Sequence, residues 1–562
     1  MRPHRWSLLL VPGLTVALAA CGGGGGGSTR SDSATPSLVG ASALPAVGKP
    51  VDGGTLRFAT DQEPDCLDPH VSPADMTATV DRNVVDSLVA QAPDGKIVPW
   101  LAASWKTSPD LRTYTFTLRK DVTFQDGAPL DAAAVKANLD HIAAPATKSQ
   151  YAVNLLGPYT GSKVIDAHTL QVGFKKPNAP FLQAASTAYL GILSPKSLAK
   201  GNDALCNSVV GSGPFSLAGW TKRSSLTLKR NPDYKWPPPF ASGQGPAHLD
   251  EVVYRFLPDD AVRLGALTSG QADLVQSLPP RSVATVKKDS KLQFFYASVP
   301  GANYNLFFNN AKGVFADENV RVAFQRSLDL DALVKSASDG QFQRGWSLIG
   351  PATVGYDAKT ENSWPYDQGL ANQKLDSAGW KERDSAGYRT KDGKRLVVDW
   401  LQPPQGEQQN GPRSTLAQLI QASVKQIGIQ LKLDPVPIGT YLKRYTSGEY
   451  DLADYSFVRN DPDILRLEFS SATRPHDGIP NQNVSLLADP TIDKLFAEGS
   501  STLDVAKRAA AYAKVQEYLN THAVSIPGYV PTNLYAARKQ VQGLVWDAAA
   551  FPVLQSAWIA AG

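Results

Sequence analysis

The sequence predicts a mixed α/β protein with more than one lobe. Residues 113–119 alternate apolar and polar side chains, which is typical of a half-buried strand. Other stretches repeat apolar residues every three or four positions, which is typical of helices, and they alternate with single strands along the chain. At 562 residues the chain is long enough for two or three domains. Helices interleaved with single strands therefore indicate helix-covered sheets in more than one lobe.

The first well-defined elements lie between residues 113 and 142. Residues 113–119 are predicted as a strand, and Asp126-Gly127 is a turn signal after it. Asp131 stands where the N-cap of the following helix is expected. The apolar residues are Tyr114, Phe116 and Leu118 on the strand and Val135, Leu139 and Ile142 on the helix.

Three more helices are predicted further along the chain. Asp317 is placed to cap the first, Gly428 ends the second, and a strand over 429–433 follows that glycine. The apolar stripes are Val320, Phe324 and Leu328; Leu416, Leu419, Ile420, Val424 and Ile427; and Val505, Ala509, Tyr512, Val515 and Leu519.

The N-terminus has the pattern of a bacterial lipoprotein signal. Arginines at positions 2 and 5 precede an apolar core at 6–16, which is too short to span a bilayer. The small residues Ala19 and Ala20 then precede Cys21, so we expect cleavage after residue 20 and a diacylated Cys21. The alternative is a plain secretory signal with an incidental cysteine. Either pattern predicts an extracytoplasmic protein, and the first predicts one anchored by lipid to the cell membrane, in the periplasm or at the cell surface.

Residues 21–51 are predicted to be a flexible tether. Residues 22–27 are all glycine, and residues 28–50 are rich in Ser, Ala, Gly and Pro. A coil of this length reaches roughly 30 Å in root-mean-square terms.

The composition after the signal is that of an ordinary globular protein. The chain is 42% hydrophobic and 19% charged. The chain has 56 basic and 52 acidic residues. Removal of the signal takes away two arginines, which leaves 54 basic residues and a net charge of +2. These charges are interspersed, which argues against a nucleic-acid partner.

The chain has three cysteines, of which Cys21 is assigned to the lipid. Cys66 and Cys206 remain in an oxidising compartment, where such a pair tends to form a disulfide. The alternative is two unconnected buried thiols.

No motif for catalysis, for a cofactor or for a metal is present in the sequence. The chain has no G-x-S-x-G elbow, no H-E-x-x-H, no Cys-x-x-Cys and no complete phosphate loop. The seven histidines lie far apart, so we expect them at the surface or in loops and expect no metal site. The protein is accordingly not expected to be an enzyme, and no cofactor is expected.

A series of short segments resembles one family over about 480 residues. The segments are 53–58 (GGTLRF), 66–69 (CLDP), 99–105 (PWLAASW), 114–119 (YTFTLR), 122–127 (VTFQDG), 211–215 (GSGPF), 228–234 (LKRNPDY), 270–274 (GQADL), 305–310 (NLFFNN), 320–324 (VRVAF) and 450–452 (YDL). In this order they are similar to the family 5 extracellular solute-binding proteins, the dipeptide and oligopeptide receptors of ABC importers.

The resemblance implies a two-lobed periplasmic-binding-protein type II fold with an extra inserted subdomain. Lobe I would comprise residues 52–277 and 521–562, with the inserted subdomain near 95–200, and lobe II would comprise 278–520. Two strands would cross between the lobes, near 277–280 and near 526–529, beside prolines. Closure about a ligand needs only a few such hinge residues to move.

The resemblance also implies the function of a monomeric receptor. It would capture a peptide or peptide-like solute and deliver it to a membrane permease, whose separate ATPase subunits hydrolyse ATP. Alternatives are a receptor of the same family for an acidic metabolite, an opine, a metal chelate or a sugar. Less favoured alternatives from other classes are a solute sensor and a secreted hydrolase.

The ligand-binding segment departs from the family pattern. Peptide-binding relatives hold the ligand's α-ammonium with an aspartate, three residues after an aromatic residue. Here Tyr455 matches the aromatic, but Val458 replaces the aspartate and Arg459 follows it. A buried ammonium needs a charged partner. Short peptides with a free amine are therefore expected to bind poorly unless another acid, Asp461 or Glu63, takes over.

Other readings of this segment remain open. The ligand could lack a free amine or be anionic, with Arg459 as its fork-shaped donor. Arg459 could instead face solvent. Tyr455 is expected to pack against the ligand, and Tyr304 to do so from the same lobe.

Overall fold

The computed structural model describes residues 47–403, 412–475 and 481–560. The predicted signal, Cys21 and most of the predicted tether lie outside the described residues. Within them, strands and helices alternate from residue 55 to residue 559, which confirms the mixed α/β prediction. No helix in the described part is long and apolar enough to cross a membrane.

The largest sheet has seven strands and draws on both ends of the described chain. Its strands in spatial order are β12 (Leu292–Ser298), β21 (Thr532–Arg538), β11 (Leu274–Val275), β1 (Thr55–Thr60), β10 (Glu251–Phe256), β9 (Ser225–Arg230) and β8 (Phe215–Thr221). The central strand β1 runs parallel to β10 and β11, while β12 and β21 pair antiparallel from Leu292↔Arg538 to Ser298↔Thr532. Parallel central strands have both faces covered, and on β1 Leu56 and Phe58 on one face and Ala59 on the other are fully buried.

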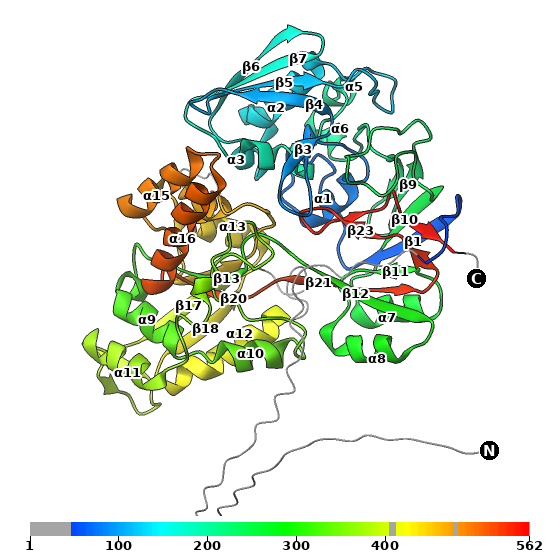
Figure 1. Cartoon of the computed structure of the whole chain (residues 1–562). Helices are drawn as coiled ribbons and strands as arrows, with labels where there is room; N and C mark the ends of the chain where they lie inside the picture. The colour runs from blue at the N-terminus through cyan, green and yellow to red at the C-terminus, as the bar shows by residue number, and fades with distance from the viewer. Residues whose placement is uncertain (1–46, 404–411, 476–480, 561–562) are drawn as a thin grey trace, which may run out of the picture. The chain divides into compact units, whose positions relative to one another are not determined.

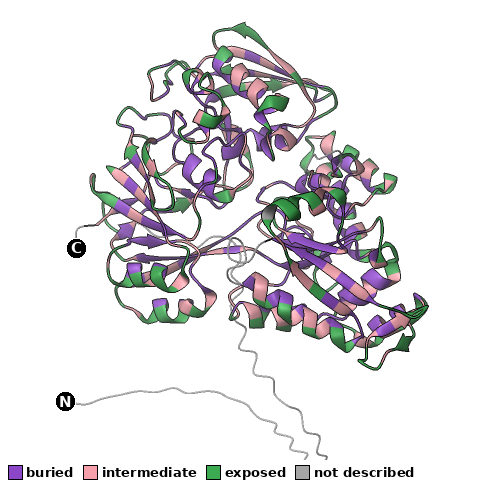
Figure 2. Ribbon diagram, turned by 180° about the vertical axis from the view of Figure 1, so that it is seen from behind, coloured by how far each residue is buried: buried purple, intermediate pink, exposed green. Residues whose placement is uncertain are grey.

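A second sheet has five strands and a separate apolar core. Its strands in order are β18 (Gln430–Pro435), β17 (Val397–Gln402), β19 (Leu452–Tyr455), β13 (Tyr304–Phe308) and β20 (Ser525–Tyr529). Leu306 and Phe308 on β13 pack in one cluster with Val398 and Trp400 on β17. Figure 2 shows these strands as mostly buried, with the exposed residues on the outer faces of the helices around them.

A third sheet of four strands lies within the region predicted as an insertion. Its strands in order are β4 (Ala102–Thr107), β5 (Thr113–Leu118), β7 (Thr169–Phe174) and β6 (Tyr159–Asp166). Tyr114 and Phe116 on β5 are fully buried, as the alternating pattern predicts. Helix α2 (Ala132–Ala143) contacts β6 and β7 (Figure 1).

Short sheets and helices complete the described chain. The remaining strands are β2 (Val89–Gln91) with β3 (Ile97–Pro99); β14 (Glu382–Arg383) with β15 (Arg389–Lys391) and β16 (Lys394–Arg395); β22 (Val541–Gln542) with β25 (Trp558–Ile559); and β23 (Val545–Trp546) with β24 (Pro552–Val553). The other helices are α1 (Asp75–Asp81), α3 (Ala152–Leu156), α4 (Phe181–Ala184), α5 (Pro195–Leu198), α6 (Asn202–Leu205), α7 (Asp260–Thr268), α8 (Val283–Lys288), α9 (Glu318–Arg326), α10 (Leu330–Ala337), α11 (Gln368–Ser377), α12 (Pro412–Gln426), α13 (Ile438–Ser447), α14 (Ile464–Phe469), α15 (Pro490–Ser500) and α16 (Val505–Thr521).

The predicted helix caps are present. The carboxylate of Asp131 accepts from the backbone N–H of Ala134, and that of Asp317 accepts from Asn319. Each satisfies a backbone donor that the first helical turn leaves free. The late helix α16 differs from its prediction over its first turns, because Val505 is 77% exposed and Ala509 is also exposed rather than part of the buried stripe.

The chain changes sheets at two adjacent segments, and one of them differs from the prediction. Residues 277–280 were expected to cross, but β12 at Leu292–Ser298 still pairs in the seven-stranded sheet. Pro280 instead begins a short 3₁₀-helix, Pro280–Ser282. The change comes at 299–303, between β12 and β13, and at 530–531, between β20 and β21 (Figure 1). Val299 N–H donates to Pro531 O at 2.9 Å, so the two segments run side by side.

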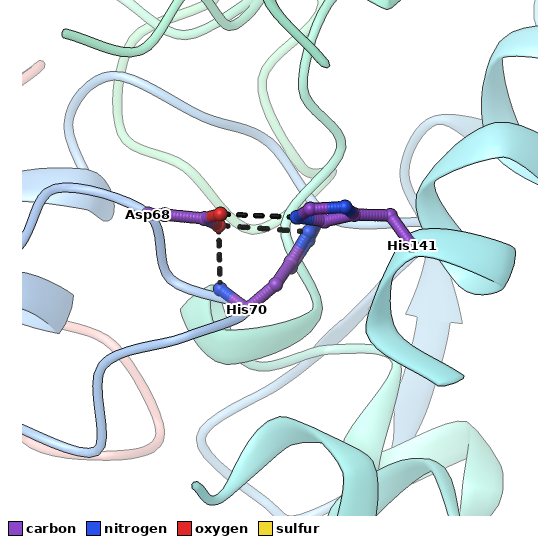
Figure 3. Close-up of side chains that lie close together, drawn as sticks. All are labelled: Asp68, His70 and His141. Carbon is purple, nitrogen blue, oxygen red and sulfur yellow. Dashed lines mark hydrogen bonds and ion pairs between the residues drawn. The ribbon is translucent and has the colours of Figure 1, made fainter. Parts of the chain in front are cut away.

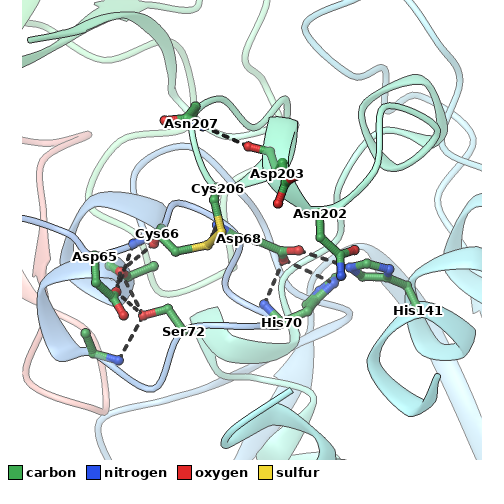
Figure 4. Close-up of a disulfide and its surroundings, with 12 residues drawn as sticks. Asp65, Cys66, Asp68, His70, Ser72, His141, Asn202, Asp203, Cys206 and Asn207 are labelled. Carbon is green, nitrogen blue, oxygen red and sulfur yellow. Dashed lines mark hydrogen bonds and ion pairs between the residues drawn. A yellow bond between two sulfur atoms is a disulfide. The ribbon is translucent and has the colours of Figure 1, made fainter. Parts of the chain in front are cut away.

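A disulfide joins Cys66 to Cys206, the pair that the sequence predicts (Figure 4). Cys66 lies in the loop after β1, and Cys206 follows α6. The bond closes a loop with a sequence separation of 140.

Candidate ligand-binding site

The segment after β19 lies directly against the first crossing segment. Ala302 N–H donates to Phe457 O at 2.9 Å, and Arg459 N–H donates to Pro300 O at 3.1 Å. Gly301 lies between these bonds with a φ of +115°, and a Cβ there would stand 2.3 Å from Phe457 O. Glycine alone fits both the backbone angle and the close approach. Residues 457–459 are thus fixed to the place where the chain passes from one sheet to the other.

Aromatic rings flank this segment. Tyr455 stacks on Phe307 with ring centroids 4.2 Å apart, and Tyr151 stacks on Phe457 at 5.3 Å. The Tyr455 hydroxyl donates to Gln482 O. Tyr455 as a whole is half-buried.

Val458 and Arg459 are both buried. Val458 is 7% exposed and its carbonyl accepts from the Tyr151 hydroxyl at 3.0 Å. Arg459 is 1% exposed, so the alternative in which it faces solvent is wrong. Its Nε donates to Gln183 Oε1 at 3.2 Å and its Nη1 contacts Asp463 at 3.2 Å, while its Nη2 has no hydrogen-bond partner among the described residues. One arm of the guanidinium fork is therefore both buried and unpaired within the described chain.

The two acids named as substitutes for the missing aspartate are already engaged. Asp461 receives two hydrogen bonds from Arg508, at 2.6 and 2.8 Å. Glu63 accepts from Trp220 Nε1 at 2.9 Å and from the backbone N–H of Arg223. A carboxylate held by its own cation or donors offers less to a ligand than a free one.

Tyr304 lies on the opposite face of the five-stranded sheet from Tyr455. Asn305 pairs with Tyr455 across the ladder, and neighbouring residues on a strand point to opposite faces. Tyr304 is 3% exposed, stacks on Tyr529 at 4.6 Å and donates to Asp454. The structure therefore does not bring Tyr304 together with Tyr455, and its place is in the core of that sheet.

The sequence did not predict a role for Glu468, a buried acid that follows this segment in the chain. Glu468 on α14 is fully buried, and neither of its carboxylate oxygens has a hydrogen-bond partner among the described residues. Burial, and next the charge of Glu468, raise the pKa of Tyr455 well above its usual range. Burial likewise raises the pKa of Glu468 well above its usual range. The signal in the sequence was a lone acid between Leu467 and Phe469, in an apolar stretch.

Asp463, five residues before Glu468, is also buried but is paired with two arginines. Asp463 contacts Arg459 at 3.2 Å and Arg466 at 2.7 Å. Although burial disfavours its charged form, the guanidinium groups of Arg466 and Arg459 hold the pKa of Asp463 well below its usual range. Within the part of the chain that the structure describes, Glu468 has no such cation.

Two cavities lie elsewhere, and none of the predicted ligand residues lines them. One of about 170 Å³ is lined by Arg82, Asp86 and Trp100 among others, and includes Gln91 and Gln183. The other, about 910 Å³, lies beside α12 and β18. Gln91 contacts Asn460 and Gln183 contacts Arg459, so the smaller cavity adjoins residues 459–460 without being lined by them.

Three residues with metal-binding side chains come together although the sequence predicted no metal site. Asp68, His70 and His141 place one ligand atom each within 4.8 Å of the others (Figure 3). His70 lies in a loop, as the sequence predicted, but it is fully buried there rather than at the surface. Spacing along the chain missed the group because His141 lies on α2, 71 residues after His70, and only the fold joins them.

Comparison with known proteins identifies the family. The family model described as "Bacterial extracellular solute-binding proteins, family 5 Middle" matches residues 96–471. The chain belongs to this family. The glutathione-binding protein GsiB of Salmonella paratyphi A is 26% identical to it over 522 residues, which cover 91% of this chain and 93% of GsiB.

Solved structures of family 5 proteins have the same fold. The binding protein AgaA of A. tumefaciens R10, in complex with agropinic acid, matches with a TM-score of 0.75 and 26% identity over 91% of this chain and 99% of AgaA. DppA from Helicobacter pylori, in complex with the peptide STSA, matches with a TM-score of 0.76 and 25% identity over 91% of this chain and 99% of DppA. The two-lobed type II fold is thereby confirmed, and the family 5 relatives are solute-binding proteins rather than enzymes.

Proposed function

We propose that this family 5 protein is a lipid-anchored extracytoplasmic receptor that captures a peptide or peptide-like solute for an ABC importer. Relatives named for glutathione and for peptides support this solute class. The alternative is a non-peptide solute, which the relative bound to agropinic acid supports. Hydrolysis of ATP belongs to separate subunits, because the chain carries no complete phosphate loop.

The observation that carries the peptide proposal is the buried, unpaired carboxyl group of Glu468. A buried carboxylate without a partner is strongly disfavoured, so a fold that keeps one gains from a cationic ligand. A peptide supplies that cation in its α-ammonium group. Glu468 would then perform the task that Val458 cannot perform at the position used by the peptide-binding relatives.

The other groups of the segment complement a peptide's remaining features. The free Nη2 of Arg459 matches a ligand carboxylate or carbonyl oxygen, because an N–H of guanidinium donates to both. The ring of the half-buried Tyr455 offers an apolar surface for a side chain. We therefore assign Tyr455, Val458, Arg459 and Glu468 to the ligand site. Asp461 and Glu63 are assigned a structural role around this site rather than contact with the ligand, since their carboxylates already accept hydrogen bonds from other residues.

Calorimetry with matched peptides tests this assignment. The unmodified protein is expected to bind a peptide with a free amine at least about tenfold more tightly than its N-acetylated form. Glu468→Gln should remove that preference, while the exposed Glu498→Gln serves as a matched control. A preference for the free amine that persists in Glu468→Gln would contradict the role of this residue, and equal binding of both peptides would favour the non-peptide alternative.

A further inference from the structure

A histidine–aspartate cluster lies away from the ligand segment, beside the disulfide. Asp68 and His70 lie in the loop after β1, and His141 lies near the end of α2. Asp68 and His70 are fully buried, and the side chain of His141 is 15% exposed. Figure 3 shows both imidazole rings directed at the Asp68 carboxylate. His70 Nδ1 is 3.7 Å from Asp68 Oδ1, and His141 Nε2 is 3.0 Å from Asp68 Oδ2.

The outer hydrogen bond of His70 fixes its tautomer. His70 Nε2 is 2.9 Å from the carbonyl oxygen of Gly191. A carbonyl oxygen only accepts, so Nε2 carries the proton. In the neutral ring, Nδ1 then presents a lone pair, and Nδ1 is a buried atom with no hydrogen-bond partner among the described residues. That lone pair faces the oxygen of a carboxylate.

The same reasoning applies to His141. The Thr147 hydroxyl donates its only proton to the carbonyl oxygen of His141. At 3.3 Å from His141 Nδ1 it can therefore only accept, so Nδ1 carries the proton. In the neutral ring, His141 Nε2 also presents a lone pair to Asp68. Two imidazole lone pairs and one carboxylate thus converge, and such an arrangement needs a cation among them.

We propose that Asp68, His70 and His141 form a binding site for one divalent transition-metal ion of the zinc class. Two imidazole nitrogens and a carboxylate oxygen are a common protein ligand set for such ions. Metal-bound histidines usually donate their other ring N–H to a protein oxygen, and here Gly191 O and Thr147 Oγ1 are in place to accept. The fourth position would be taken by water, which would reach the ion from the side of the partly exposed His141.

The position of the cluster gives the ion a structural role. Asp68 follows Cys66 by two residues, and its backbone N–H lies 3.4 Å from Cys66 Sγ (Figure 4). The disulfide ties the loop after β1 to Cys206, while the ion would tie the same loop to α2 on the four-stranded sheet. Two crosslinks of different chemistry would then fix one loop.

Metal binding by the purified full-length chain tests the proposal. The chain carries Cys21→Ser so that no free thiol competes, and it is first stripped with a chelator. Zn²⁺, Ni²⁺ and Ca²⁺ are then titrated separately, with stoichiometry from native mass spectrometry and stability from thermal unfolding. We expect one Zn²⁺ or Ni²⁺ per chain and a higher melting temperature, and no bound Ca²⁺, because imidazole suits transition metals rather than hard cations.

Three substitutions locate the ion. His141→Ala should weaken Zn²⁺ binding at least about 100-fold, since loss of an outer partner alone costs 10–100-fold. Thr147→Val leaves all three ligands in place and should weaken binding about 10–100-fold. His522→Ala is the matched control, because His522 also contacts one carboxylate, Glu318 at 3.0 Å, and should leave binding unchanged.

Two results would overturn the proposal. The first is an unmodified chain that retains neither Zn²⁺ nor Ni²⁺, which would mean that protonated imidazoles supply the cation. The second is a folded His141→Ala or Thr147→Val chain that binds Zn²⁺ as tightly as the unmodified chain. If His141→Ala does not fold, Thr147→Val decides the matter alone.

Discussion

At the scale of single residues, the candidate site lacks the aspartate expected from peptide-binding relatives but has a different buried acid. Val458 stands where peptide-binding relatives are expected to have an aspartate, and Glu468 supplies a buried carboxyl group ten residues later. The sequence could predict the loss of the aspartate, because the aromatic residue Tyr455, three positions earlier, fixes the alignment. It could not predict the buried carboxyl group of Glu468, since burial and the lack of a partner depend on contacts between residues far apart in the chain. Likewise, only the strand register separates Tyr304 from Tyr455.

The unpaired acid should lower the stability of the protein without ligand. Burial raises the pKa of Glu468 in the folded state, so the unfolded chain loses this proton at lower pH than the folded one. Stability should therefore fall as pH rises above the unfolded value of about 4.5. Glu468→Gln removes this loss, and at pH 7 we expect its free energy of unfolding to be higher by about 1–3 kcal/mol.

Urea denaturation between pH 4.5 and 7.5 measures this difference, with Glu498→Gln as control. The gain from Glu468→Gln should grow with pH. A difference that shrinks as pH rises would show that Glu468 is stably ionised and paired.

At the scale of elements, patterns within a segment predicted the structure well. The strand at Thr113–Leu118 and the caps at Asp131 and Asp317 depend on local periodicity and on donors a few residues away. The prediction that the chain crosses between lobes at 277–280 is wrong. Prolines occur at several kinds of element boundary, and here Pro280 begins a 3₁₀-helix. The position of the crossing depends on which strands pair in each sheet, and these strands lie far apart in the sequence. We propose that the lobes meet at 299–303 and 530–531, where Pro300 and Pro531 limit the backbone.

The contact between the crossing segment and the ligand segment should be sensitive to one methyl group. Gly301→Ala would place a Cβ 2.3 Å from Phe457 O and 2.5 Å from Arg459 N. We expect displacement of residues 457–459 and a loss of ligand affinity of at least about tenfold, measured by calorimetry. Gly219→Ala, where a Cβ meets nothing within 4 Å, is the control. Unchanged affinity in a folded Gly301→Ala protein would separate this contact from ligand binding.

The disulfide should contribute strongly to stability because its loop is long. In the chain-entropy model, a loop closed over a separation of 140 residues stabilises by about 5 kcal/mol. We expect the double substitution Cys66→Ala and Cys206→Ala to lower the free energy of unfolding in urea by a large part of this amount. A loss below about 1 kcal/mol would show that the bond adds little beyond the packing around it.

At the scale of the whole molecule, the proposal is a tethered receptor. The lipoprotein pattern places the anchor at Cys21, and the tether ends near residue 51, where the described fold begins. Family membership supports the extracytoplasmic location, since the family is described as extracellular. The resemblance predicted the fold over most of the chain, because its segments recur in order. It left the solute open, because the ligand segment is where the sequence departs from the pattern.

The anchor makes a simple prediction. Cys21→Ser should release the protein into the medium or leave the precursor unprocessed, because a diacylated cysteine holds a protein firmly to a membrane. Fractionation followed by intact-mass measurement distinguishes these results. Mature Cys21→Ser protein that still fractionates with the membrane would contradict the lipid anchor.

We propose that the protein captures its solute through the unpaired acid Glu468. Native mass spectrometry of the protein purified from its producing cells tests this most directly. We predict one copurified solute per chain, with a free amine and the composition of a peptide or peptide-like compound, and its loss from Glu468→Gln but not from Glu498→Gln. A retained solute without an amine, or equal retention by Glu468→Gln, would contradict the account.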